Sequence, residues 1–113
     1  MVGHAQLAHL DVTIVRFVDE YQPGFIACKF LDAIGRIHAF VGKVPIFSSE
    51  DLDASSEYPR QGAVRCSILE AWRDSEGRDL VCISTDEPDA EQSTEGLTEF
   101  VVLDSQLSRD YSA

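Results

Sequence analysis

Two stretches of this chain share one order of residues, and that order constrains the fold more than any other feature. Residues 24–36 read GFIACKFLDAIGR, and residues 62–78 read GAVRCSILEAWRDSEGR. Each begins with Gly-x-[Ile/Val]-x-Cys and ends with Asp-x-x-Gly-Arg. An Asp followed three residues later by Gly favours a short hairpin loop, because Asp caps the following amides and Gly accepts a positive φ. We therefore interpret both stretches as β-hairpins and not as a recognition motif used twice.

The loop of the first hairpin sets the register that we expect for its two strands. A four-residue loop at residues 32–35 places Leu31 opposite Arg36 and Lys29 opposite His38. Successive side chains of a strand point to opposite faces of a sheet. This register therefore predicts a wholly apolar inner face and leaves His38 on the outer face.

The second hairpin turns at residues 74–77 and is longer. The corresponding register pairs Ile68 with Ile83 and places Trp72 opposite Asp79, one step from the tip. Both faces of its middle are apolar, so we expect this hairpin to lie at the centre of the sheet.

Further strands at residues 10–18 and 98–103 bring the expected total to about six, mostly antiparallel. Short turns, two long hairpins and no helical stripe longer than two turns predict an all-β fold, a small β-barrel. A β-sandwich is the alternative, and a sheet covered by a helix is third. In Val44–Phe47, the proline cannot donate to a strand ladder, which predicts an exposed edge strand or a bend.

The same pattern divides the chain into three parts. We expect a flexible N-terminal segment at residues 1–9, a single all-β domain at residues 10–103, and a polar C-terminal tail at residues 104–113.

The balance of charge argues against some partners. Nine Lys and Arg against twenty Asp and Glu give a formal net charge of −11. Direct nucleic-acid binding is disfavoured, because affinity for a phosphate backbone comes largely from basic side chains. A basic protein partner would be steered in by an attraction that salt screens. Solubility alone is the other explanation of the acidity.

The sequence also bears on location and on bound groups. It has no basic segment followed by an apolar signal core and no run of ~18 apolar residues, so we expect a cytoplasmic protein without a membrane span. The number of cysteines is odd, and no Cys-x-x-Cys occurs. We expect buried, reduced thiols and predict neither a metal site nor a cofactor. The potential ligands considered are Cys28, Cys66, Cys82, His4, His9 and His38.

No catalytic residue can be assigned from the sequence. There is no Gly-x-Ser-x-Gly elbow, and two of the three histidines lie within the first nine residues. With twenty acids some carboxylate pair is bound to be close, so such a pair carries no information. We lean against an enzyme.

Two features are candidates for contacting a partner. Trp72, near a hairpin tip, is an aromatic anchor in one interpretation and packs over the barrel end in the other. An acidic loop at residues 86–95 would supply a charged rim if the two share an end. The partner-binding candidates are Trp72, Asp86, Glu87, Asp89, Glu91 and Glu95.

These features predict a domain that acts by binding, with a protein as the expected partner and a basic one favoured. We expect a monomer, or a weak dimer paired through the Val44–Phe47 edge. The alternatives are a barrel that binds a small ligand, a minor enzyme that uses carboxylates, and a structural or assembly subunit. The sequence does not decide among them.

Overall fold

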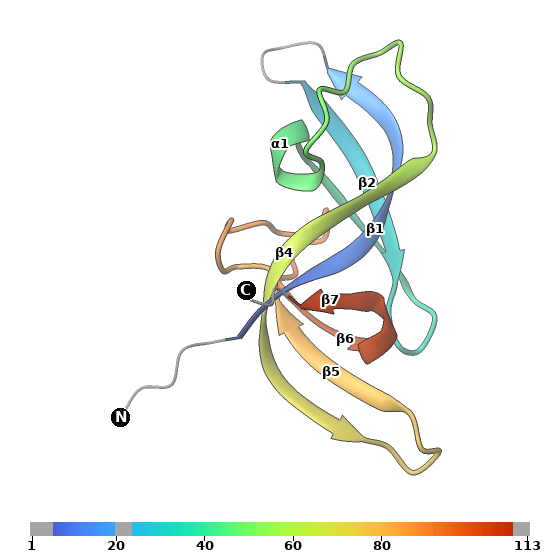
Figure 1. Ribbon diagram of the computed structural model, residues 1–113, viewed down its shortest axis with the longest axis vertical. Helices are drawn as coiled ribbons and strands as arrows, with labels where there is room; N and C mark the ends of the chain where they lie inside the picture. Colours follow the sequence, from blue (N-terminus) through green and yellow to red (C-terminus); the bar gives the residue numbers. More distant parts are fainter. Residues whose placement is uncertain (1–5, 20–23, 110–113) are drawn as a thin grey trace.

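A computed structural model describes residues 6–19 and 24–109 of the protein. Seven strands form one antiparallel sheet that curls into a half-barrel (Figure 1), which confirms the all-β prediction. The strand order is β3-β2-β1-β4-β5-β6, and β7 also pairs with β1. The strands are β1 (Gln6–Asp19), β2 (Phe25–Leu31), β3 (Ile37–Lys43), β4 (Arg60–Arg73), β5 (Asp79–Ser84), β6 (Glu99–Leu103) and β7 (Leu107–Arg109).

Strand β1 pairs with three other strands and changes neighbours along its length. One side pairs with β4 from Gln6 to Ile14, and the other side pairs first with β7 and then with β2. The prediction of a flexible segment is therefore wrong for residues 6–9, which pair with β4 in the sheet. Residues 1–5 lie outside the described residues.

The C-terminal prediction also needs correction. Residues 104–109 are not a tail: they form a 3-10 helix, η1 (Asp104–Gln106), and strand β7. The reason is Leu107, which pairs with Leu10 and packs against the core. Residues 110–113 lie outside the described residues.

Three loops share one geometry, which confirms that Asp-x-x-Gly-Arg belongs to the fold. In each, the amide of the first residue donates to the carbonyl of the fifth, and the amide of the fourth donates to the carbonyl of the first. The third loop, at residues 93–97, begins with Ser93 in place of Asp. The fourth residues Gly35, Gly77 and Gly96 have φ values of 84°, 82° and 83°.

Because the loop has five residues, the predicted register of the first hairpin is wrong by one. The Asp32 carboxylate accepts the amides of Ile34 and Arg36, which draws Arg36 into the loop. Phe30 therefore pairs with His38. This shift moves every side chain of β3 to the other face, and His38 is buried with only 5% of its surface exposed.

In the second hairpin, the same extra loop residue is offset by a β-bulge between Ile68 and Glu70. The predicted pairing of Ile68 with Ile83 is confirmed beyond the bulge. Between the bulge and the tip the register is shifted, so Trp72 lies opposite Leu80 and not opposite Asp79.

The Val44–Phe47 segment is a short helix, α1, and not an edge strand. Proline is well suited to the first turn of a helix, where its missing N–H is not needed. Val44 and Phe47 are buried, and the helix covers one end of the curled sheet (Figure 1). The segment therefore offers no strand edge for the weak dimer that we predicted.

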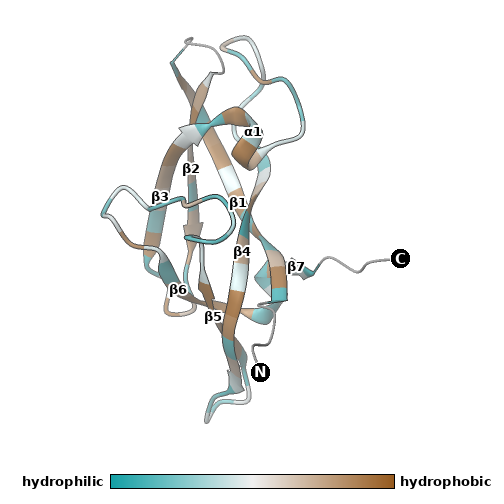
Figure 2. Ribbon diagram, turned by 90° about the vertical axis from the view of Figure 1, so that its left-hand side faces the viewer, coloured by the Kyte–Doolittle hydropathy of each residue, from teal (hydrophilic) through white to brown (hydrophobic). Residues whose placement is uncertain are grey.

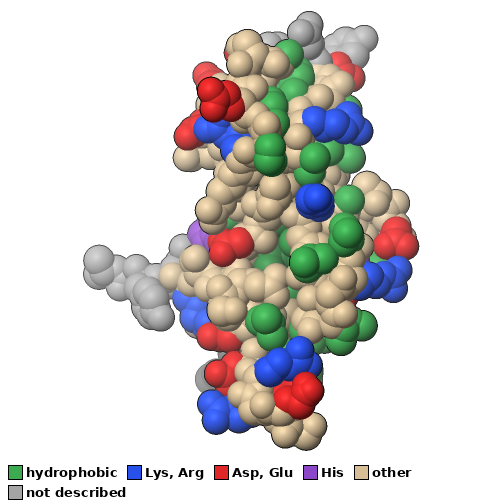
Figure 3. Space-filling model, turned by 90° about the vertical axis from the view of Figure 1, so that its right-hand side faces the viewer, with side chains coloured by type: hydrophobic (Ala, Val, Ile, Leu, Met, Phe, Trp, Pro, Cys, Tyr) green, Lys and Arg blue, Asp and Glu red, His purple; other side chains and the backbone are tan. Residues whose placement is uncertain are grey.

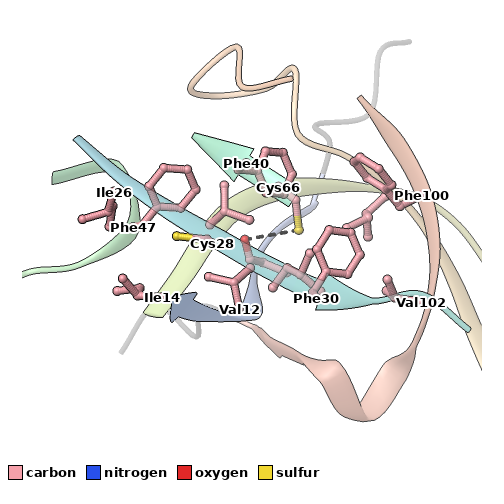
Figure 4. Close-up of a cluster of buried hydrophobic side chains, with 14 of the residues drawn as sticks. Val12, Ile14, Ile26, Cys28, Phe30, Phe40, Phe47, Cys66, Phe100 and Val102 are labelled. Carbon is pink, nitrogen blue, oxygen red and sulfur yellow. Dashed lines mark hydrogen bonds between the residues drawn. The ribbon is translucent and has the colours of Figure 1, made fainter. Parts of the chain in front are cut away.

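The interior of the curl is filled mainly by aromatic and aliphatic side chains. Figure 4 shows Phe30, Phe40 and Phe100 turned toward one another, with ring centroids between 5.2 and 5.9 Å apart. Brown, apolar bands mark the strands in Figure 2, and the teal loops lie at their ends. Two loops bridge the open side of the curl: the amide of Ala33 donates to Val101, and that of Thr94 donates to Ala39.

Candidate binding surface

The outer face of strands β1, β2 and β3 carries exposed aliphatic side chains in register. Leu31 lies opposite Ile37, and Ala27 lies opposite Val41. Leu31, Ile37 and Val41 are 54%, 59% and 44% exposed. The register that we predicted for the first hairpin, which is wrong by one residue, had placed Ile37 and Val41 on the inner face. The sequence analysis therefore did not predict this surface. We call the following residues the outer face: Thr13, Arg16, Asp19, Phe25, Ala27, Lys29, Leu31, Ile37, Ala39, Val41 and Lys43.

The same surface holds every Lys and Arg that lacks an acidic partner among the described residues. All nine basic side chains lie in that part of the chain, and six arginines are in ion pairs with Asp or Glu. The other three are Arg16, Lys29 and Lys43, and all three belong to the outer face. Figure 3 looks onto this side, where Lys and Arg side chains stand among hydrophobic ones. Cationic and aliphatic groups thus coincide on a chain whose net charge is −11.

The outer face continues into an open groove of about 770 Å³. Asp11 and Thr13 line it at the point where the neighbour of β1 changes from β7 to β2. Leu31 and Ile37 of the outer face also line it. Gln106 closes the gap between β2 and η1, because its amide donates to the Leu31 carbonyl at 2.8 Å and its oxygen accepts the Leu103 amide. The remaining lining residues are Val12, Lys29, Phe30, Pro59, Arg60 and Gln61.

Three of the five predicted binding residues of the acidic loop are in ion pairs or partly buried. Asp89 accepts two hydrogen bonds from the Arg65 guanidinium, at 3.1 and 2.6 Å, and Glu95 forms an ion pair with Arg36. Glu91 lies against Gly42, and burial, with a smaller effect of the Asp89 charge, raises its pKa. Asp86 and Glu87 are the two loop candidates that are exposed and have no ion pair among the described residues.

Trp72 and the acidic loop are not brought together. Trp72 is 38% exposed beside the tip of the β4–β5 hairpin, at the bottom of Figure 1. The acidic loop follows the opposite end of β5. Four residue steps from Leu80 to Ser84 separate the two by about 13 Å along the strand, at about 3.3 Å per residue. The expected charged rim around Trp72 is therefore absent from the described residues.

One buried polar pair was missed by the sequence analysis because of the shifted register. His38 Nε2 lies 2.8 Å from Asp32 Oδ2, and the ring sits between Phe30 and Phe100. Burial alone would raise the pKa of Asp32, but the hydrogen bonds from His38 and from the Arg36 and Ile34 amides lower it below 3.8. An ionised Asp32 requires a proton on Nε2, which leaves Nδ1 as the acceptor in a neutral ring.

His38 Nδ1 is itself buried, without a hydrogen-bond partner among the described residues. A catalytic base must reach the proton that it removes. Because Nδ1 faces the interior, the pair fixes the first hairpin loop to the core and does not present a base to a substrate.

Two of the three cysteines, Cys28 and Cys66, are buried and have weakly acidic thiols. Burial, with a smaller effect of Glu91, raises the pKa of Cys28 to about 12. Burial raises the pKa of Cys66 to about 11 although Arg109 opposes the shift, and its Sγ donates to the Ala8 carbonyl (Figure 4). Since the thiolate is the nucleophile, these two thiols are inert near neutral pH.

Other kinds of site find little support in the described part of the chain. There, no group of three or more His, Cys, Asp or Glu side chains is placed to hold a metal ion. Within the same residues, no helix is long and apolar enough to cross a bilayer. No known protein family, curated protein or solved structure matches this chain.

Proposed function

We propose that the protein is a binding domain that docks another protein on the outer face of β1, β2 and β3. One observation carries this proposal: exposed aliphatic side chains lie in register beside the three basic side chains that lack an acidic partner. Contiguous apolar patches are uncommon on monomers and often mark interaction sites.

The exposed aliphatic side chains would contribute to docking together and not singly. Full burial of one aliphatic side chain contributes about 1.5–3 kcal/mol. Leu31, Ile37 and Val41 are each about half exposed. Covering each of them would therefore contribute about 1 kcal/mol, which is less than a single hot spot, and the three together about 3 kcal/mol.

The alternatives have weaker support. The interior is filled by side chains such as Phe40 and Phe100, so a ligand-binding or enzymatic role would have to use a surface cavity such as the open groove. A structural subunit that paired two outer faces would set Lys29 and its neighbours against like charges. The basic partner expected from the net charge stays a separate prediction, and it rests on Asp86 and Glu87, the exposed carboxylates of the acidic loop.

The test is capture of partners from a lysate of the source organism, with matched surface variants. The face variant carries Leu31→Ser and Ile37→Ser, and the control carries Asp86→Ser and Glu87→Ser on the acidic loop. All four side chains are exposed, so both variants should keep the fold, which circular dichroism checks. A protein retained by the wild type and the control but lost by the face variant supports the proposal.

Two outcomes contradict it. A partner that the face variant retains and the loop control loses would favour docking of a basic protein on the acidic loop. Retention of no specific protein, at either low or physiological salt, would remove the support for a protein partner.

A further inference from the structure

We propose that the occupant of the outer face is an extended protein segment that carries carboxylates between aliphatic residues. This inference rests on the proposed function and names the chemistry of the partner. It departs from the expectation of a basic partner, because the net charge of the molecule and the charge of this surface have opposite signs.

Local charge governs a docked segment more than net charge does. At physiological ionic strength, charges more than about 8 Å apart are largely screened from one another. Arg16, Lys29 and Lys43 have no ion pair among the described residues, whereas the acids at residues 89 and 95 are neutralised by arginines. A carboxylate on the outer face therefore meets available positive charge even though the whole chain repels it.

The order of side chains along the strands specifies a pattern. Leu31 and Ile37 form an aliphatic row, and Lys29 stands one step further. Val41 and Arg16 share the next row, and Lys43 shares the last row with Phe25 and Asp19. Side chains on one face of a strand recur about every 6.8 Å, so these four rows span about 20 Å. An extended segment of about seven residues covers that length, with an aliphatic residue at one end and carboxylates at the third and fifth positions, beside Lys29 and Arg16.

Other occupants match this surface less well. A second copy placed face to face would oppose Lys29, Arg16 and Lys43 with the same cations. A nucleic acid would meet only three cations on this face, and only Phe25, which is partly buried, could stack on a base. A basic peptide would be repelled locally.

The salt dependence separates the acidic segment from a basic partner. For a basic partner, long-range attraction to the net charge of −11 is screened, so binding weakens steadily with added salt. For an acidic segment, the same long-range field opposes approach at low salt. Salt removes that opposition first, so binding should change little, or strengthen, between about 0.01 and 0.15 M ionic strength.

The experiment is selection of a displayed library of random twelve-residue peptides on the immobilised full chain. Selection on a variant carrying Arg16→Glu and Lys29→Glu serves as the matched control. We expect enriched peptides with negative net charge and aliphatic residues, about tenfold weaker binding to the variant, and NMR shift changes confined to β1, β2 and β3.

Enriched peptides that are basic, that bind the variant equally well, or that shift signals elsewhere would overturn the inference, as would the absence of enrichment. Binding to vesicles of phosphatidylserine and phosphatidylcholine in place of peptides would overturn it as well. If the lysate partner is lost by the Leu31 and Ile37 variant while the peptides are not acidic, only this inference fails. If both experiments fail, the proposed function fails with it.

Discussion

Replacing Asp32 with Asn tests whether the buried pair with His38 fixes the first hairpin to the core. Asn keeps an oxygen for the Ile34 and Arg36 amides but turns an NH2 group toward His38 Nε2. Either two donors then face each other, or the ring moves its proton to Nδ1, which has no partner among the described residues. Both arrangements leave a buried polar group unsatisfied.

The magnitude follows from burial, since only 12% of the Asp32 side chain and 5% of His38 are exposed. A hydrogen bond to a charged group contributes about 1.5–3 kcal/mol, so Asp32→Asn should lower the free energy of unfolding by about 2 kcal/mol. In a domain of this size that corresponds to a fall of about 8 °C in Tm.

Asp74→Asn is the matched control, because Asp74 makes the same loop contacts in the second hairpin. Its carboxylate accepts the amides of Glu76 and Arg78, but its second oxygen meets the exposed Arg78 guanidinium in place of a buried histidine. We therefore expect a smaller loss. Urea unfolding followed by circular dichroism at pH 7 measures both variants.

The pH dependence supplies an independent check. The folded pKa of Asp32 lies below its ordinary value of 3.8, so its contribution is present above that pH and is lost as the pH falls through the folded pKa. The difference between wild type and Asp32→Asn should shrink toward pH 3. Equal losses for the Asp32 and Asp74 variants, or a difference that does not change with pH, would refute the reasoning.

Three further predictions concern the core and its rim. Gly62→Ala would place a Cβ 2.8 Å from the Phe47 carbonyl oxygen, and this overpacking should reduce stability by about 1–3 kcal/mol in urea unfolding; an unchanged midpoint would contradict the tight packing of α1 on β4. Cys28 and Cys66 should react with a thiol reagent at pH 8 no faster than the protein unfolds, because their thiols stay protonated; rapid labelling of the native protein would contradict their inertness. Glu91→Gln should stabilise the fold at pH 7 by less than about 1 kcal/mol, and should have no such effect at pH 4. The pKa of Glu91 is raised in the folded protein, so its ionisation above pH 4.5 costs more in the folded than in the unfolded state. A variant that is less stable than the wild type at pH 7 would reveal a favourable partner for the carboxylate.

The sequence was sufficient for the class of fold and for both hairpins, because turn residues and β-branched runs act locally. It could not decide the register of the first hairpin. Alternate positions of β3 are apolar on both faces, with Ile37 and Val41 on one and Phe40 on the other. The decision comes from the Arg36 amide, which bonds to the Asp32 carboxylate and lengthens the loop by one residue.

The candidate surface was hidden for a second reason. Whether a basic side chain has an acidic partner is a tertiary property, since Arg36 and Glu95 are 59 residues apart and Arg65 and Asp89 are 24 apart. Nothing in the local sequence distinguishes these arginines from Arg16. The unpaired cations could be identified only once the fold had paired the others.

The most direct test of the docking surface is amide hydrogen exchange of this protein in complex with its captured partner. We predict slowed exchange in residues 27–31 and 37–41 relative to the free protein, and no change around Trp72 or in residues 86–91. Protection confined to the acidic loop or the β4–β5 tip, with unchanged exchange in β2 and β3, would contradict docking on the outer face.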